Sequence, residues 1–156
     1  AGILKKADED TGKGILLNYI SDAAKAKGTG KWTSQNAMDI QAPIPSINAA
    51  VEMRDISKYK EERVEASKQL KWDDVSETSE EEIFAALTDA FYFGMITIYA
   101  QGLAQLTIAS KEYDYGLNLE EVAKIWRGGC IIRAACLEDF RQAYSKSPEL
   151  PNLLLD

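Results

Sequence analysis

Histidine is absent from this 156-residue sequence, and cysteine occurs only twice. Without histidine, the chain alone cannot form a zinc site from the usual ligands or a histidine-based catalytic triad, and we expect no metal. Cys130 and Cys136 are predicted to lie in one helix on largely opposite faces, where they cannot bond to each other. Free thiols fit a reducing compartment, and no signal peptide is visible at Ala1–Lys6, so the predicted location is cytoplasmic.

The sequence also has fewer positive than negative charges: 25 acidic residues outnumber 18 lysines and arginines, and the net charge is -7. This balance disfavours binding to nucleic acid or to an anionic membrane through the whole surface, although it allows a local cationic pocket. Strand-like alternation, repeats of fixed period and low-complexity runs are missing as well. With 46% hydrophobic and 28% charged residues, the chain fits one soluble all-α domain with a hydrophobic core.

One long apolar stretch organises the sequence. Ser79–Glu82 has the pattern of a capping box, and no proline occurs from there to Tyr113, so we predict one continuous helix. A helix that is apolar on nearly every face must be surrounded by other helices or by lipid. Gln101 and Gln105 in its middle, and the lack of flanking clusters of lysine or arginine, favour a core helix over a membrane span. The expected architecture is a multi-helix domain packed around this central helix.

Shorter helices are predicted on both sides of the long one. Asp8–Gly14 is expected to be a turn-rich connector, and Leu153–Leu155 to have nothing after it in the chain to pack against. The expected helices cover Ile15–Lys25, Thr33–Gln41, Ser46–Leu70 with a possible kink near 58–60, Leu119–Trp126 with Asn118 as its cap, and 132–143.

The segment Lys25–Thr33 combines lysines, glycines and threonines around Trp32. Glycines let backbone amides approach a ligand, and lysine and hydroxyl side chains suit a phosphate or a carboxylate. A Walker A loop is excluded, because its first glycine is missing at Lys25 and Trp32 stands where Ser or Thr should follow Gly-Lys. The segment is therefore either an anion site or a flexible basic turn that ends the preceding helix.

Arg54 is the second unusual position. It follows Ile47, Ala50 and Val51 on one helical stripe, where an apolar residue would be expected. A buried guanidinium needs an anion, because an unpaired buried charge costs on the order of several kcal/mol. That anion is either a bound ligand or an acidic side chain of the chain itself.

Three blocks together resemble the motifs of 6-phosphogluconate dehydrogenase, the decarboxylating enzyme of the pentose phosphate pathway. They are Lys27–Thr33, Tyr99–Gly102 and Ile125–Arg133, in matching order and spacing, and the similarity extends from the first residues to Asn152–Leu155. The resemblance implies an all-helical C-terminal domain that follows an NADP-binding Rossmann domain and forms most of a homodimer interface. Residues 1–156 would be part of that domain.

The resemblance also implies roles for individual residues. Lys27 and Thr29 match family positions that contact the phosphate of 6-phosphogluconate, and Arg54 matches an arginine that binds the same phosphate. The family oxidises the C3 hydroxyl by hydride transfer to NADP, and the 3-keto acid loses carbon dioxide to yield ribulose 5-phosphate. Its cofactor domain, lysine base, glutamate acid and C-terminal tail lie outside these residues. We therefore expect no catalytic residue here and no turnover by this chain alone, and we interpret Arg127 and Arg133 as structural.

Two other classes remain open. One is an independent helical interaction or sugar-phosphate-binding protein without a catalytic half, and the other is a small membrane-embedded helical protein. An upstream Gly-x-Gly-x-x-Gly segment in the same reading frame would support the enzyme domain, and its absence would support the binding protein. Solubility without detergent would exclude the membrane protein.

Overall fold

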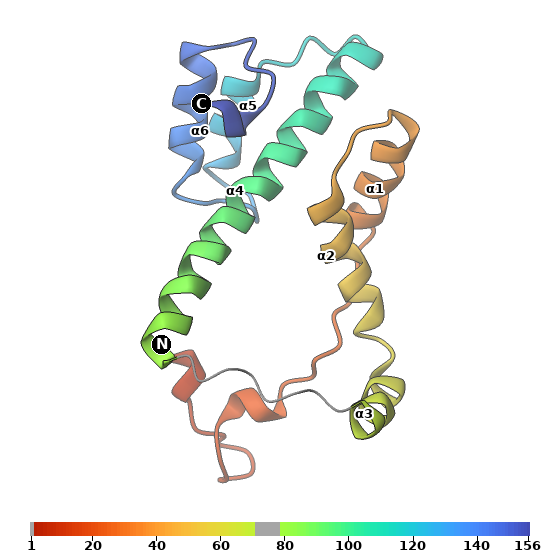
Figure 1. The fold of residues 1–156 in the computed structure, drawn as a ribbon, viewed down its shortest axis with the longest axis vertical. Coiled ribbons are helices and arrows are strands. Elements are labelled where there is room, and N and C mark those ends of the chain that lie inside the picture. Colours follow the sequence, from red (N-terminus) through yellow and green to blue (C-terminus); the bar gives the residue numbers. More distant parts are fainter. Residues whose placement is uncertain (1, 71–78) are drawn as a thin grey trace. The chain divides into compact units, whose positions relative to one another are not determined.

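The computed structural model describes residues 2–70 and 79–156, which form helices and turns without a β-strand (Figure 1). This confirms the all-α class. Contacts divide the described residues into two compact units, residues 2–26 with 53–70 and residues 27–52 with 79–156. The elements are the α-helices α1 (Thr29–Asp39), α2 (Pro45–Ile56), α3 (Lys60–Gln69), α4 (Glu80–Glu112), α5 (Leu119–Trp126) and α6 (Leu137–Lys146), and the 3-10 helices η1 (Ile3–Lys5), η2 (Leu16–Tyr19) and η3 (Leu153–Leu155).

Helix α4 is the long helix that the sequence predicts, continuous over 33 residues (Figure 1). The Ser79 hydroxyl accepts a hydrogen bond from the Glu82 amide at 3.3 Å, and the Glu82 carboxylate accepts one from the Ser79 amide at 3.2 Å. These two bonds satisfy amides that have no acceptor inside the helix, and they confirm the predicted capping box.

The two halves of α4 differ in their exposure to solvent. Ala100, Leu103 and Ala109 are buried in its second half, whereas Phe84 and Phe91 in the first half are each 72% exposed. By length and composition α4 qualifies as a candidate membrane-spanning helix, and 6% of its most apolar window is buried. In the described residues, the expected packing around a central helix is therefore found only along its second half.

The main hydrophobic core lies where α5, α6 and η3 meet the second half of α4 (Figure 1). Leu103 and Leu137 are completely buried there, and Leu153 is 6% exposed. Leu153 therefore packs against residues that precede it in the chain, whereas Leu154 and Leu155 are exposed. The Asn152 side chain accepts a hydrogen bond from the Leu154 amide at 2.9 Å and starts the turn that buries Leu153.

The helix expected over 132–143 begins later, at Leu137. Gly129 has a φ of +66°, a backbone conformation that favours glycine, and the chain then forms turns rather than a helix up to Ala135. Cys130 therefore lies before the helix and Cys136 at its start, so the prediction that both share one helix is wrong, although both thiols are free.

Two further helix predictions need correction. The helix expected over Ser46–Leu70 is divided into α2 and α3 near the expected kink at 58–60, where Tyr59 has a non-helical backbone and the Ser57 hydroxyl donates to the Arg54 carbonyl at 2.7 Å. The helix expected over Ile15–Lys25 is reduced to η2, and residues 21–27 have no regular structure.

Residues 21–27 are held by contacts with α3 and with the turn before it. The Asp22 carboxylate accepts hydrogen bonds from the Lys60 ammonium and the Arg63 guanidinium, both at 2.9 Å, and the Ala24 amide donates to the Ser57 hydroxyl at 2.9 Å. The Lys60 bond, followed by the Arg63 bond, lowers the pKa of Asp22 from 3.8 to about 2. The charged carboxylate therefore attaches this segment to α3.

We expect Asp22→Asn to loosen this attachment in a pH-dependent way. A lowered carboxylate pKa means that the stabilisation is complete above pH 3.8 and is lost as pH falls through about 2. The protection factor of the Ala24 amide in hydrogen exchange should therefore be lower in the variant at pH 6, and the two proteins should converge near pH 2. Asp89→Asn, which changes an exposed carboxylate without an ion pair in the described residues, is the control. Equal Ala24 protection in variant and wild type at pH 6 would contradict the expectation.

Candidate functional site

The basic glycine segment is a helix start rather than an extended loop. Gly28 has φ +108° and ψ -27°, and its carbonyl accepts the Trp32 amide at 2.9 Å, so α1 begins at Thr29, four residues before the predicted Thr33. A Cβ atom on Gly28 would lie 3.1 Å from the Trp32 ring and would also require a backbone conformation that L-residues rarely adopt. Glycine is thus needed at this position for two independent reasons.

The first turn of α1 has the chemistry of an anion-binding helix terminus. No side chain caps it, and the first amides of an α-helix have no acceptor within the helix. Aligned peptide dipoles add partial positive charge at this end, and Lys27, Thr29 and Lys31 are exposed around it. A phosphate or carboxylate group is the ligand that suits this arrangement.

Thr29 also borders a groove of about 770 Å³ within the second unit. Apolar side chains of α4, including Met95 and Leu106, form most of its wall, and Thr33 and Gln105 add polar groups. The groove therefore connects the first turn of α1 with the middle of α4.

Two glutamines of α4 hold the short helices that precede it. The Gln101 side-chain oxygen accepts from the amides of Ser46 and Ile47 at 2.9 and 3.3 Å. The Gln105 side-chain nitrogen donates to the Thr33 carbonyl and to Asn36 Oδ1, both at 3.0 Å. The sequence pattern showed only that these glutamines are unusual in an apolar helix, and gave no sign of their partners.

Arg54 belongs to the first unit and is exposed. Its Nη2 donates to the Lys25 carbonyl, and no carboxylate lies within ion-pair distance of it in residues 2–70 and 79–156. The predicted burial of Arg54 on an apolar stripe is wrong, because Ala50 on the same stripe is exposed too. The alternative of an internal ion pair is likewise not observed among the described residues.

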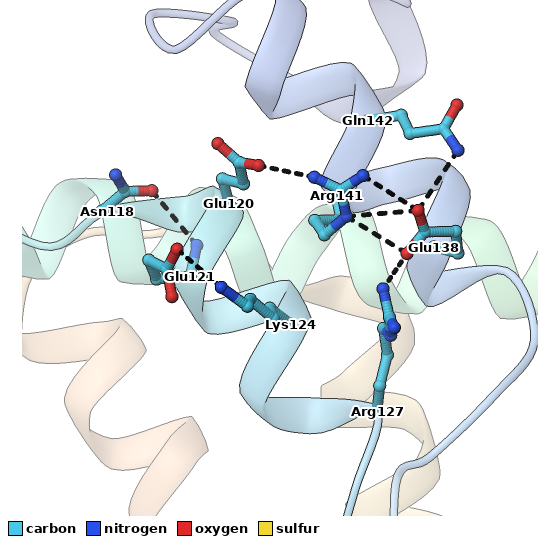
Figure 2. Close-up of polar contacts among 8 residues, drawn as sticks. All are labelled: Asn118, Glu120, Glu121, Lys124, Arg127, Glu138, Arg141 and Gln142. Carbon is cyan, nitrogen blue, oxygen red and sulfur yellow. Dashed lines mark hydrogen bonds and ion pairs between the residues drawn. The ribbon is translucent and has the colours of Figure 1, made fainter.

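The block 125–133 adjoins an ion-pair network between α5 and α6. Figure 2 shows Arg141 between Glu120 and Glu138, with guanidinium-to-carboxylate distances of 2.6 and 2.9 Å. Arg127 pairs with the same Glu138 carboxylate, as expected for a residue with a structural role. Arg133 is exposed beside a pocket of about 520 Å³ that Arg127 and Glu138 also line.

The titratable groups near the core do not suit acid–base catalysis at neutral pH. Burial raises the pKa of Tyr99, whose hydroxyl donates to the Ile132 carbonyl, and burial also raises the pKa of Cys136 and of Tyr144. Within the described part of the chain, no three His, Cys, Asp or Glu side chains are grouped so that they could hold a metal ion. The arrangement as a whole is suited to binding an anion.

Comparisons with known proteins agree on one family. A family model described as 6-phosphogluconate dehydrogenase, C-terminal domain, matches residues 1–156. The NADP(+)-dependent, decarboxylating 6-phosphogluconate dehydrogenase of Bacillus subtilis (strain 168) is 50% identical over 158 residues, covering 100% of this chain and 34% of that protein. The decarboxylating enzyme of Escherichia coli (strain K12) is 45% identical, covering 98% of this chain and 32% of that protein.

A solved structure leads to the same family. Plasmodium falciparum 6-phosphogluconate dehydrogenase, studied in its apo form, with its cofactor NADP+ and with its substrate 6-phosphogluconate, matches with a TM-score of 0.88 and 40% identity. The match covers 99% of this chain and 34% of that one, so the chain spans about a third of the length of its relatives. The chain therefore belongs to the 6-phosphogluconate dehydrogenase family, and it matches the C-terminal domain of that family.

Proposed function

We propose that these residues act within an NADP-dependent, decarboxylating 6-phosphogluconate dehydrogenase, in which they hold the substrate phosphate and supply dimer surface. The observation that supports this most directly is the uncapped first turn of α1, which places free amides beside Lys27 and Thr29. The family match and the names of the relatives supply the substrate and the cofactor.

In the proposed reaction a hydride leaves C3 of 6-phosphogluconate for NADP, and the resulting 3-keto acid loses carbon dioxide to form ribulose 5-phosphate. The role of this chain is to bind the phosphate end of the substrate. The Lys27 ammonium and the Thr29 hydroxyl donate to phosphate oxygens together with the first amides of α1. Arg54, which has no carboxylate partner in the described residues, is proposed as a further phosphate ligand. Binding energy at the phosphate then orients C3 for hydride transfer.

We further propose that the protein is a cytoplasmic homodimer. The exposed phenylalanines in the first half of α4 are an apolar surface of the kind that packs against protein. The glutamines in the second half favour protein over lipid around the rest of the helix. Two free cysteines are consistent with a reducing compartment.

The proposal is tested by comparing the 156-residue chain with the full-length protein. We expect the full-length protein to form NADPH from NADP only when 6-phosphogluconate is present, with ribulose 5-phosphate as the product. The chain alone should form none, because it contains none of the family's acid–base groups. NADPH formation by the purified chain above contaminant level would contradict the division of roles, and an inactive full-length protein would contradict the function.

A further inference from the structure

Helix α1 makes few apolar contacts: Ala37 joins a small cluster with Ala42 and Ile44, and Gly30 lies close to the Val51 side chain. Ala37 is the one buried residue among its 11, whereas Trp32 and Met38 are 63% and 72% exposed. Burial of a methyl group contributes little free energy and does not fix the rotation of a helix about its axis. Polar contacts add to this packing in setting the direction in which the first turn of α1 faces.

Gln105 supplies such interactions. It is only 7% exposed, and its side-chain nitrogen donates to the Thr33 carbonyl and to Asn36 Oδ1, both at 3.0 Å. Asn36 Nδ2 in turn donates to the Tyr113 hydroxyl at 3.2 Å, next to the end of α4. A planar amide that bonds two points of one helix fixes both its rotation and its position along the axis.

Thr33, to which Gln105 donates, lies one helical turn from the proposed phosphate ligand Thr29. Thr33 donates through its hydroxyl to the Thr29 carbonyl at 2.9 Å, so both residues belong to one hydrogen-bonded turn. An α-helix rises 1.5 Å per residue, which places Thr29 about 6 Å from Thr33 along the axis. Thr29 and Gln105 also line the same groove. A rotation of α1 would therefore displace Lys27 and Thr29 together.

We propose that Gln105 is a positioning residue for substrate binding: it orients α1 so that Lys27 and Thr29 face the substrate phosphate. The inference rests on the proposed function of these two residues. Gln105 itself does not touch the substrate, and its effect is transmitted through Thr33 and Asn36.

The test compares Gln105→Met with wild type in the full-length enzyme. Methionine conserves the volume of the side chain but removes both hydrogen bonds. We expect the KM for 6-phosphogluconate and the inhibition constant of inorganic phosphate to rise together, by about 5- to 30-fold for two lost bonds. The KM for NADP should stay within about twofold, because the change is confined to the phosphate end of the substrate, whereas kcat should fall as far as C3 loses its orientation.

Two further variants separate positioning from general damage. Asn36→Ala removes the bond from Gln105 and the bond to Tyr113 but keeps the Gln105 bond to the Thr33 carbonyl, and it should raise the same two constants. Asn118→Ala removes the cap of α5, lowers stability away from α1, and should change neither constant. A Gln105→Met enzyme with unchanged phosphate affinity, or with kcat and both KM values impaired alike, would overturn the inference.

Lys27→Ala, measured in parallel, separates this inference from the proposed function. If Lys27→Ala weakens phosphate binding and Gln105→Met does not, the positioning role alone is overturned. If Lys27→Ala leaves phosphate binding unchanged, the phosphate assignment is overturned and the positioning role with it.

Discussion

Leu137→Ala is expected to lower the free energy of unfolding by about 2–5 kcal/mol, the usual cost of truncating a fully buried leucine. Leu137 has no exposed surface and begins α6, where it contacts the cluster that joins α6 to α4. Its removal leaves a cavity between these helices that a rigid helix pair cannot fill. The measurement is urea unfolding of the 156-residue chain, followed by circular dichroism.

Leu154→Ala is the matched control, because it makes the same substitution at a side chain that is 50% exposed. A surface substitution of this kind changes stability by roughly 0.5 kcal/mol or less. If both variants lost the same amount, or if Leu137→Ala cost less than about 1 kcal/mol, α6 would not be anchored through Leu137.

Lys27→Ala is expected to weaken the binding of 6-phosphogluconate to the full-length protein by about 1.5–3 kcal/mol, or about 10- to 150-fold. The lysine lies just before Gly28 and the uncapped amides of α1, so its ammonium is proposed to share the phosphate with them. Titration calorimetry measures the loss, with inorganic phosphate as the competing ligand. Because the interaction is ionic, the difference should shrink as salt is raised.

Arg54→Ala should have an effect of similar size, since a guanidinium bond to phosphate is also charge-assisted. Lys111→Ala, which removes an exposed lysine from the last turn of α4, is the control and should leave affinity unchanged. Unchanged affinity in both Lys27→Ala and Arg54→Ala would remove the phosphate assignment.

Helices whose first residues form capping contacts with residues close in sequence could be predicted from the sequence. The capping box at Ser79–Glu82 starts α4, and the Asn118 side chain, which accepts the Glu121 amide at 3.1 Å, starts α5. Each contact spans three residues, and both helices start where expected. The segment Lys25–Thr33 was also visible as a possible anion site, because glycines and lysines lie side by side in it, whereas the roles of Lys27 and Thr29 were implied by the family resemblance.

Contacts between distant residues could not be predicted in this way. Residues 21–27 are not helical, and Asp22 within them bonds Lys60 and Arg63, which lie 38 and 41 positions away. Gln105 reaches Thr33 across 72 positions, and no periodicity in either segment indicates that bond. The orientation of the candidate site was therefore hidden, although its residues were not.

The hydrogen bonds between Gln101 and the start of α2 make the helical conformation of residues 45–56 depend on α4. Ile44 precedes α2 and Pro45 is its first residue. Neither has a side chain that could accept a hydrogen bond from the first amides of the helix. The Gln101 oxygen accepts those of Ser46 and Ile47 instead. Nucleation of a short helix is unfavourable by itself. Residues 45–56 thus gain part of their helicity only on docking to α4, so that secondary and tertiary structure form together there.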